Sequence, residues 1–255
     1  MSMNSAAESL LVFALTFTGA LVGMTLRRVL PQDHLDQDAK DTMRLAVGLV
    51  VTMTGLVLGM LVSSAKTYYD GQKNKITAIS TDIILLDNSL TAFGPEAAQT
   101  RIQARQFVQD AVDRIWPSQK SRSSQLRPKN DDRAVTMELE LLVPKNDAQA
   151  SAKTQIASLV QSMKRSYWLL FLESEQALLP MPLLIVVTSW LVTIFVSFGI
   201  FAPANPTVVL TLIICALAVS AAIFIIIEMY SPFSGVLRIS SAPVRDALNQ
   251  MATAR

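Results

Sequence analysis

The stretch TVVLTLIICALAVSAAIFIII, residues 207–227, contains no Asp, Glu, Lys, Arg or His. As an α-helix rising about 1.5 Å per residue, it would be roughly 30 Å long, which matches the hydrocarbon core of a membrane. Three more stretches share this composition and approximate length, and they cover residues 9–26, 45–65 and 181–202. Helices of soluble proteins are rarely apolar on all sides over such lengths. The four stretches therefore predict an all-α integral membrane protein with four transmembrane helices.

Helices are expected because only helices and closed barrels satisfy their backbone groups in lipid, and the spans show no strand-like alternation. The first span is not expected to be a cleaved signal peptide, because no Lys or Arg precedes it, whereas Arg27 and Arg28 follow it. The lone Cys215 makes neither an intrachain disulfide nor a zinc site. A net charge of +2 without a basic stripe gives no reason to expect a nucleic-acid partner.

The spans divide the chain into a first transmembrane pair (1–65), a helical insert (66–180), a second pair (181–230, its last span reaching residue 228) and a tail (231–255). With four spans, both termini and the insert lie on the same side of the membrane. Lys and Arg near the membrane are more numerous on that side, where they are Lys66, Lys73, Lys75, Lys164, Arg165, Arg238 and Arg245. The positive-inside rule predicts that this side is cytoplasmic, in a plasma (inner) membrane.

The insert shows the helical spacing of apolar residues. One seam continues from the second span, whose helix is expected to run on without a break, and the sequence FGPE at 93–96 is expected to turn the chain. Two further helices are predicted over 96–116 and 147–179, with an exposed polar loop at 118–134 between them. The three apolar faces comprise Tyr69, Gln72, Ile76, Ile79, Ile83, Leu86 and Leu90; Ala104, Val108, Ala111 and Ile115; and Ile156, Val160, Met163, Tyr167 and Leu170. A cytoplasmic helical bundle is predicted.

Small residues recur one turn apart in the first two spans. Gly19 with Gly23, and Gly55 with Gly59, form GxxxG pairs, which allow close helix packing in lipid. If the second pair faces a neighbouring helix, the row Thr54, Leu58 and Val62 lies about 100° around the second span. That row is a candidate pore lining in an oligomer, where an apolar constriction can gate by dewetting. Contact with lipid or with the chain's own core is the alternative for each of these three residues.

The sequence carries little catalytic or metal-binding chemistry. Loop 27–44 holds Asp33, His34, Asp36, Asp38 and Asp41, but the glycine and glutamate of a calcium loop are missing, and solvated acids with a helix cap explain it better. No Walker loop, Rossmann fingerprint or nucleophile elbow is present. We therefore expect no enzyme, cofactor or metal. Because the spans contain no ionisable residue, active transport is not expected, whereas a passive pore is compatible with them.

The last span ends in a crowded segment, EMYSPFSG, at 228–235. We expect Glu228 to stay hydrated at the interface, Pro232 to stop the helix, and Phe233 to fold back as an interfacial anchor. Gly235 permits a sharp bend. The sequence SSAPVRDALNQM at 240–251 then predicts an amphipathic tail helix along the cytoplasmic bundle.

Three segments resemble the bestrophin-like bacterial membrane family of undefined function, which is distantly similar to the bestrophin anion channels: IEMYSPFSG (227–235), LVLGMLVSSAKTYYDGQKNKI (56–76) and LPQDHL (30–35). Glu228, Pro232, Phe233 and Gly235 resemble the acid and Pro-Phe-Gly that follow the last bestrophin span. The Arg-Trp-Trp usual after the second bestrophin span is absent near Tyr68. The resemblance implies a symmetric homo-oligomer, a pentamer if it assembles as bestrophins do, whose second span lines a narrow apolar neck.

Two hypotheses follow from these observations. The first is an oligomeric channel in the lipid membrane that conducts inorganic ions passively, with anions preferred, through a pore lined by the second span. The second is a non-conducting scaffold or signalling protein whose cytoplasmic helices bind a partner, and the apolar seams of the insert motivate it.

Overall fold

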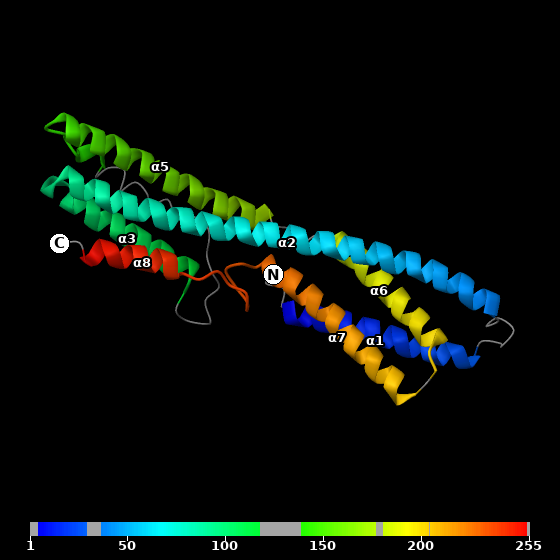
Figure 1. Cartoon of the computed structure of the whole chain (residues 1–255). Helices are drawn as coiled ribbons and strands as arrows, with labels where there is room; N and C mark the ends of the chain where they lie inside the picture. The colour runs from blue at the N-terminus through cyan, green and yellow to red at the C-terminus, as the bar shows by residue number, and fades with distance from the viewer. Residues whose placement is uncertain (1–4, 30–36, 118–138, 177–180, 204, 254–255) are drawn as a thin grey trace. The chain divides into compact units, whose positions relative to one another are not determined.

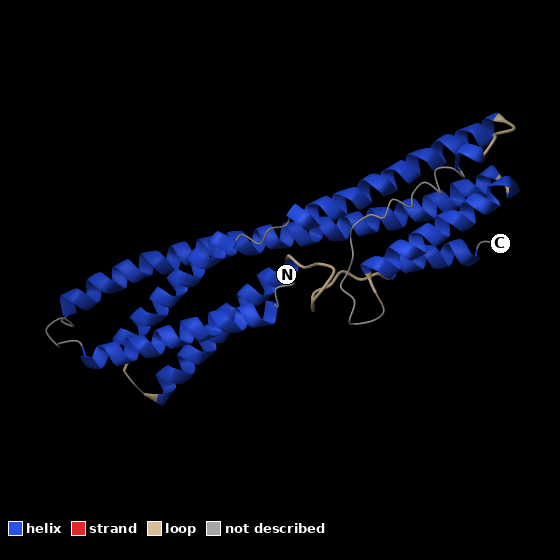
Figure 2. Ribbon diagram, turned by 180° about the vertical axis from the view of Figure 1, so that it is seen from behind, coloured by secondary structure: helices blue, strands red, loops and turns tan. Residues whose placement is uncertain are grey.

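The computed structural model describes residues 5–29, 37–117, 139–176, 181–203 and 205–253, and the regular structure within these ranges is helical (Figure 2). The elements in chain order are α1 (Ser5–Val29), α2 (Gln37–Phe93), the 3-10 turn η2 (Pro95–Ala97), α3 (Ala98–Ile115), α5 (Asp147–Gln176), α6 (Met181–Phe201), α7 (Pro206–Met229) and α8 (Ala242–Thr253). The chain folds as two compact units. One comprises residues 1–68 and 178–230, and the other comprises residues 69–177 and 231–255.

The first unit contains the apolar helices. The helices α1, α2, α6 and α7 are each long and apolar enough to cross a membrane, and each contains one predicted span. The prediction of an all-α membrane protein with four such helices is confirmed. One boundary differs: Arg27 and Arg28 lie in the last turn of α1 rather than in a loop. Cations at a helix C-terminus interact favourably with the helix dipole, which explains why α1 continues to Val29.

The helices α1 and α6 pack backbone against backbone in the first unit. A Cβ atom added to Gly23 would overlap the carbonyl oxygen of Val196, and one added to Gly199 would overlap the carbonyl oxygen of Ala20. At Gly19 an added Cβ would lie 3.2 Å from Cγ1 of Val192. Such close approach maximises dispersion contacts where lipid supplies no hydrophobic driving force. Glycine is therefore required on both helices of this contact.

The second unit is built on the predicted seam of α2. Ile76, Ile83, Leu86 and Leu90 are all buried, and α3, α5 and α8 supply the facing residues (Figure 1). The predicted continuity of the second span with this seam is also confirmed, because α2 is a single helix of 57 residues. The seam keeps one face of the helix out of water over about five turns, which is why this half of α2 needs partners.

The predicted turn after α2 is confirmed as well. Gly94 has φ 112°, a left-handed conformation that favours glycine, and Pro95 opens η2. Just before this turn, the buried carboxylate of Asp87 accepts a hydrogen bond from Nη2 of Arg101 on α3 at 2.9 Å. The same Nη2 also donates to the carbonyl oxygen of Met251 on α8 at 3.0 Å. One guanidinium thus joins three helices of the unit.

The segment after α7 belongs to the second unit. Helix α7 ends at Met229, three residues before Pro232, and the chain bends at Gly235, where φ is 82°. Phe233 is not an interfacial anchor, as the sequence suggested, but is buried with an edge-to-face contact to Trp116. The indole of Trp116 donates to the carbonyl oxygen of Ile239 at 2.9 Å. The predicted tail helix is confirmed as α8, which buries Val244, Ala247, Leu248 and Met251 against the same core.

Several predictions fall on residues that the structure does not describe. These are the exposed loop at 118–134 and the acids of loop 27–44 as far as Asp36, with His34 among them. Helix α2 already begins at Gln37, so the connection is shorter than predicted. Within the described part of that segment, Asp41 forms an exposed ion pair with Arg44 at 3.2 Å.

Candidate functional site

The membrane half of α2 is the candidate site. It contains no Pro, and its Thr hydroxyls bond to the helix itself, with Thr52 donating to the carbonyl oxygen of Gly48 at 2.9 Å and Thr54 to that of Val50 at 2.7 Å. Polar side chains are thereby satisfied without water or a second helix, as a lipid environment requires. The helix can therefore place its remaining surface against any apolar neighbour.

One face of α2 is covered by the chain's own helices. Thr54, Leu61 and Ala65 are buried, with Thr54 4% exposed, and Leu58 is partly buried. They recur at spacings of three, four and seven residues, so they lie on one side of the helix. Their apolar members pack in a cluster that includes Ile223 and Ile226 of α7 and Val187 of α6. This side of α2 is the part that holds the first unit together.

The rest of α2 is bare within the chain. Only 11% of its most apolar stretch is buried, compared with 28% for α1, 44% for α6 and 33% for α7. Two rows occupy this surface. The small-residue row comprises Gly48, Thr52, Gly55, Gly59 and Ser63, all exposed. The large-residue row lies roughly 80° further around the helix at 100° per residue and comprises Leu49, Met53, Leu56 and Met60, all exposed.

The predicted packing glycines separate into two groups. Gly19 and Gly23 lie against α6 as described above. Gly55 and Gly59 face open space, because a Cβ added to either would meet no atom within 4 Å. Packing at the second pair stays a prediction, and any partner for it lies outside the single chain.

The predicted pore row is also divided. Thr54 and part of Leu58 face the chain's own helices, and Val62 alone of the three is exposed. The row of Thr54, Leu58 and Val62 stays a prediction as a pore lining, and which face of α2 is covered depends on where α6 and α7 pack. A single helix contains no signal for which face that is.

The acid at the end of α7 lies in a polar cluster that sequence reasoning missed. Glu228 was expected to be hydrated, but it is 2% exposed and accepts a hydrogen bond from the hydroxyl of Ser5 on α1. Next to it along the chain, Tyr230 stacks on Tyr68 with ring centroids 5.5 Å apart, and its hydroxyl lies 3.3 Å from Oγ of Ser64. The start of α1, the middle of α2 and the end of α7 are thus tied by side chains. Ser5 carried no detectable sequence signal, because it precedes the apolar stretch.

Metal chemistry finds no support in the described residues, which contain no group of three or more His, Cys, Asp or Glu placed to hold an ion. Cys215 is exposed on α7. What the site offers is a long, largely uncovered apolar helix with a small-residue flank. That arrangement suits assembly around an axis better than it suits catalysis.

Comparisons with known proteins give one match. A family model described as "Bestrophin-like domain" matches residues 14–244, which include α2, the insert, α6, α7 and the segment after α7. No curated protein and no solved structure matches the chain.

Proposed function

The chain belongs to the bestrophin-like family, and on this premise we propose that identical copies assemble into a ring around a passive ion pore lined by α2. The observation that carries the proposal is the exposure of α2. Of the four spans, α2 has the smallest buried share of its most apolar stretch. An apolar helix that spans lipid and has partners in its own chain along one face only can pack its other faces against further copies. A ring also places one face of each copy at a common axis.

The two rows of α2 support a head-to-tail contact. In a cyclic ring each copy presents different surfaces to its left and right neighbours. The small-residue row with Gly55 and Gly59 offers a shallow flank, and the large-residue row with Met53 and Met60 offers a protruding one. Packing the protruding flank of one α2 against the shallow flank of the next brings helices close without polar contacts. Gly55 and Gly59 then serve the packing role predicted for them, between copies.

The pore lining follows from the same geometry. The covered side of α2, with Thr54, points away from the axis, so the opposite side faces it. That side lies between the two rows and carries Leu56 and Ser63, both exposed. The proposed pore lining is therefore Leu56 and Ser63 instead of the row of Thr54, Leu58 and Val62. Val62 lies beside the small-residue row. A ring of leucines makes an apolar constriction that gates by dewetting.

Passive conduction is favoured over pumping because the central parts of the spans carry no ionisable side chain for proton or ion coupling. Anions are the proposed permeant ions. They shed water more readily than small cations in an uncharged pore, and helix N-terminal dipoles attract them. The excess of Lys and Arg on the insert side supports cytoplasmic termini and insert, in an inner membrane.

The alternative of a scaffold loses its motivating observation. The seams of α2 and α5 that would bind a partner are used within the second unit, where Ile83, Leu86, Ile156 and Leu170 are all buried. The apolar seams that were predicted for the insert are thus paired within the unit.

The test is chloride flux from liposomes that contain the purified protein. Leu56→Ala is expected to raise flux several-fold, because it widens the constriction. Leu58→Ala is the matched control, since it changes the same residue type half a turn away on the covered side, and it is expected to lower stability while leaving flux per folded particle unchanged. Absence of flux in the wild type and in Leu56→Ala, or a monomeric particle mass in detergent, would contradict the proposal.

A further inference from the structure

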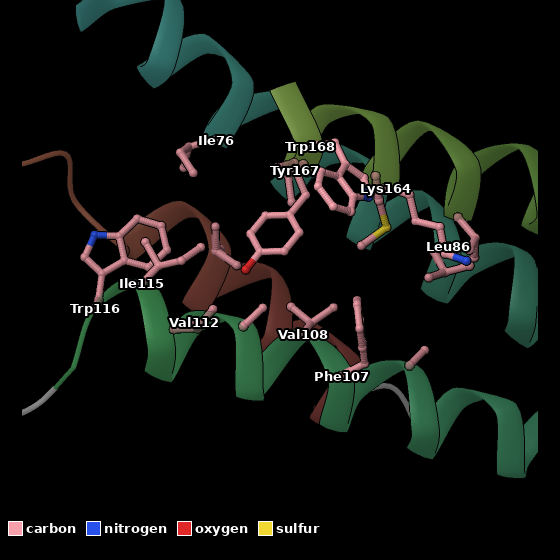
Figure 3. A pocket seen from close by; sticks show the side chains of 16 residues that line it. Ile76, Leu86, Phe107, Val108, Val112, Ile115, Trp116, Lys164, Tyr167 and Trp168 are labelled. Atoms are coloured by element: carbon pink, nitrogen blue, oxygen red, sulfur yellow. The ribbon is translucent and has the colours of Figure 1, made fainter. Parts of the chain in front are cut away.

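The second unit contains a partly open cavity that the proposed pore does not use. It has a volume of about 100 Å³ and lies among residues of α2, α3, α5 and α8 (Figure 3). Apolar side chains make most of its wall, including Val108 and Val112 of α3, Val160 and Met163 of α5, and Val244 of α8. An apolar cavity of this size stays dry unless an apolar group fills it. The wall therefore selects for a hydrocarbon body.

One polar group enters this apolar space without a partner. The ring of Tyr167 on α5 reaches toward α3, where Val108 and Val112 lie (Figure 3). Its hydroxyl is buried and makes no hydrogen bond among the described residues. Burial raises the pKa of this hydroxyl above its usual value, so the hydroxyl is protonated at neutral pH. It is therefore a hydrogen-bond donor that lacks an acceptor among the described residues. A buried donor left unpaired is unusual in a folded protein and calls for an explanation.

The charge around this hydroxyl is positive. Arg114 of α3 acts electrostatically on Tyr167, and its Nη1 is also buried without a partner among the described residues. Its Nε donates to the backbone carbonyl of Asp110 at 3.1 Å, which leaves the charge uncompensated by that bond. Lys164 of α5 also lines the cavity and already makes an interaction of its own. The acceptor that fits here is therefore an anion.

We propose that this cavity binds a short-chain monocarboxylate, whose alkyl body fills the apolar space and whose carboxylate accepts the hydrogen bond of Tyr167 beside Arg114. An apolar cavity of about 150 Å³ accommodates benzene, so the present one suits an alkyl body of roughly four to five carbons. A carboxylate supplies two acceptor oxygens and one negative charge, which satisfies the hydroxyl and a guanidinium together. This binding is independent of ion conduction.

The test is calorimetric titration of the detergent-solubilised full chain with pentanoate, and with pentanol as the matched probe that lacks the charge. Pentanoate is expected to bind at least tenfold more tightly than pentanol. Tyr167→Phe, which removes only the hydroxyl, is expected to weaken pentanoate binding about tenfold, the size of one hydrogen bond to a charged group. Arg105→Gln is the control, because Arg105 is an exposed cation on the same helix α3.

A second variant keeps the test decisive if Tyr167→Phe folds poorly. Ala111 lines the cavity, so Ala111→Leu should fill it and abolish the heat of pentanoate binding while raising the unfolding temperature of the ligand-free protein. Equal affinity for pentanoate and pentanol, binding that survives both variants, or no heat with any carboxylate from acetate to octanoate would overturn the proposal.

Discussion

The two units of the chain are both helical, but they satisfy their buried polar groups in different ways. In the first unit the buried hydroxyls of Thr16, Thr54 and Ser197 each donate to a carbonyl oxygen one turn earlier on their own helix. In the second unit the buried Asp87 is held by Arg101 of another helix, and Glu173 of α5 accepts from Gln72 and Lys75 of α2. Within its spans the first unit keeps polarity local, and its hydrogen bonds between helices, Ser5 with Glu228 and Ser64 with Tyr230, lie at the end of α7. The second unit uses charged side chains to join helices along their length.

The difference follows from the solvent of each unit. In lipid no water is present to hydrogen-bond an unpaired polar group, so a hydrogen bond within the same helix avoids the cost of leaving that group unpaired. The helices themselves associate by close packing of small residues. In water the unfolded chain hydrates its charges, so an interhelical ion pair is useful only where geometry and burial repay desolvation. We expect backbone proximity to dominate stability in the first unit and buried side-chain pairing to dominate it in the second.

The largest effect is expected at the α1–α6 contact. Gly23→Ala forces a methyl group against the carbonyl oxygen of Val196 and the backbone of Gly199, where no side chain can move aside. We expect a loss of about 3 kcal/mol or more, at the upper end for overpacked sites. Thermal unfolding of the detergent-solubilised protein measures it.

Gly55→Ala is the matched control for this change, because the added methyl group meets no atom of the chain. Better helix propensity should leave the single chain equally stable or more stable, by up to about 1 kcal/mol. In the proposed ring the same change crowds the contact between copies, so the particle mass should fall. Equal losses of chain stability at Gly23 and Gly55 would show that close backbone packing at the α1–α6 contact does not dominate the stability of the first unit.

The second effect is expected at the buried ion pair. Asp87→Ala leaves the guanidinium of Arg101 without its carboxylate near the core, and we expect a loss of about 2 to 3 kcal/mol, since Arg101 retains some contact with water. Asp82→Ala, on the same helix, removes an exposed acceptor of the Ser162 hydroxyl and should cost less than about 1 kcal/mol. Denaturant titration of both variants gives the difference. A loss at Asp87 no larger than at Asp82 would show that interhelical pairing does not stabilise the second unit.

Much of the fold could be predicted from the sequence because it is written in local patterns. The spans could be predicted from uncharged stretches whose helical length matches the thickness of a membrane. The seam from Ile76 to Leu90 could be predicted from apolar residues spaced three and four positions apart. The turn could be predicted from Gly94 and Pro95, because the left-handed conformation that glycine adopts and the fixed φ of proline act through the local backbone and not through tertiary contacts. Phe233 was misplaced because an aromatic residue after a span suits an interface and a core equally well. Only the position of Trp116, distant in sequence, decides between them.

The candidate site was less accessible to sequence reasoning, since it depends on the relative rotation of packed helices. Thr54 and Gly55 are neighbours in sequence, yet one is buried and the other open. The apolar composition of α2 is uniform around its axis, so no residue marks which side α6 and α7 cover. The cavity beside Tyr167 arises from four helices that meet imperfectly, and an unfilled volume leaves no trace in any one of them.

The smallest effect tests whether exposed charge pairing matters at all in the second unit. Lys145 donates to the exposed carboxylate of Glu96 at 2.6 Å, and this hydrogen bond lowers the pKa of Glu96 below its ordinary value of 4.5. Because the folded pKa is the lower one, the pair stabilises the fold above about pH 4.5, and its contribution is lost as the pH falls through the folded pKa. The stability difference between the wild type and Glu96→Gln should therefore be small and constant near neutral pH, shrink below pH 4.5, and shrink also in high salt. Lys145→Gln should show the same pH profile, because it removes the other half of the pair. A difference that persists at pH 3 would mean that Glu96 acts through packing near Gly94 rather than through charge, and the contrast between the units would then rest on the buried pairs alone.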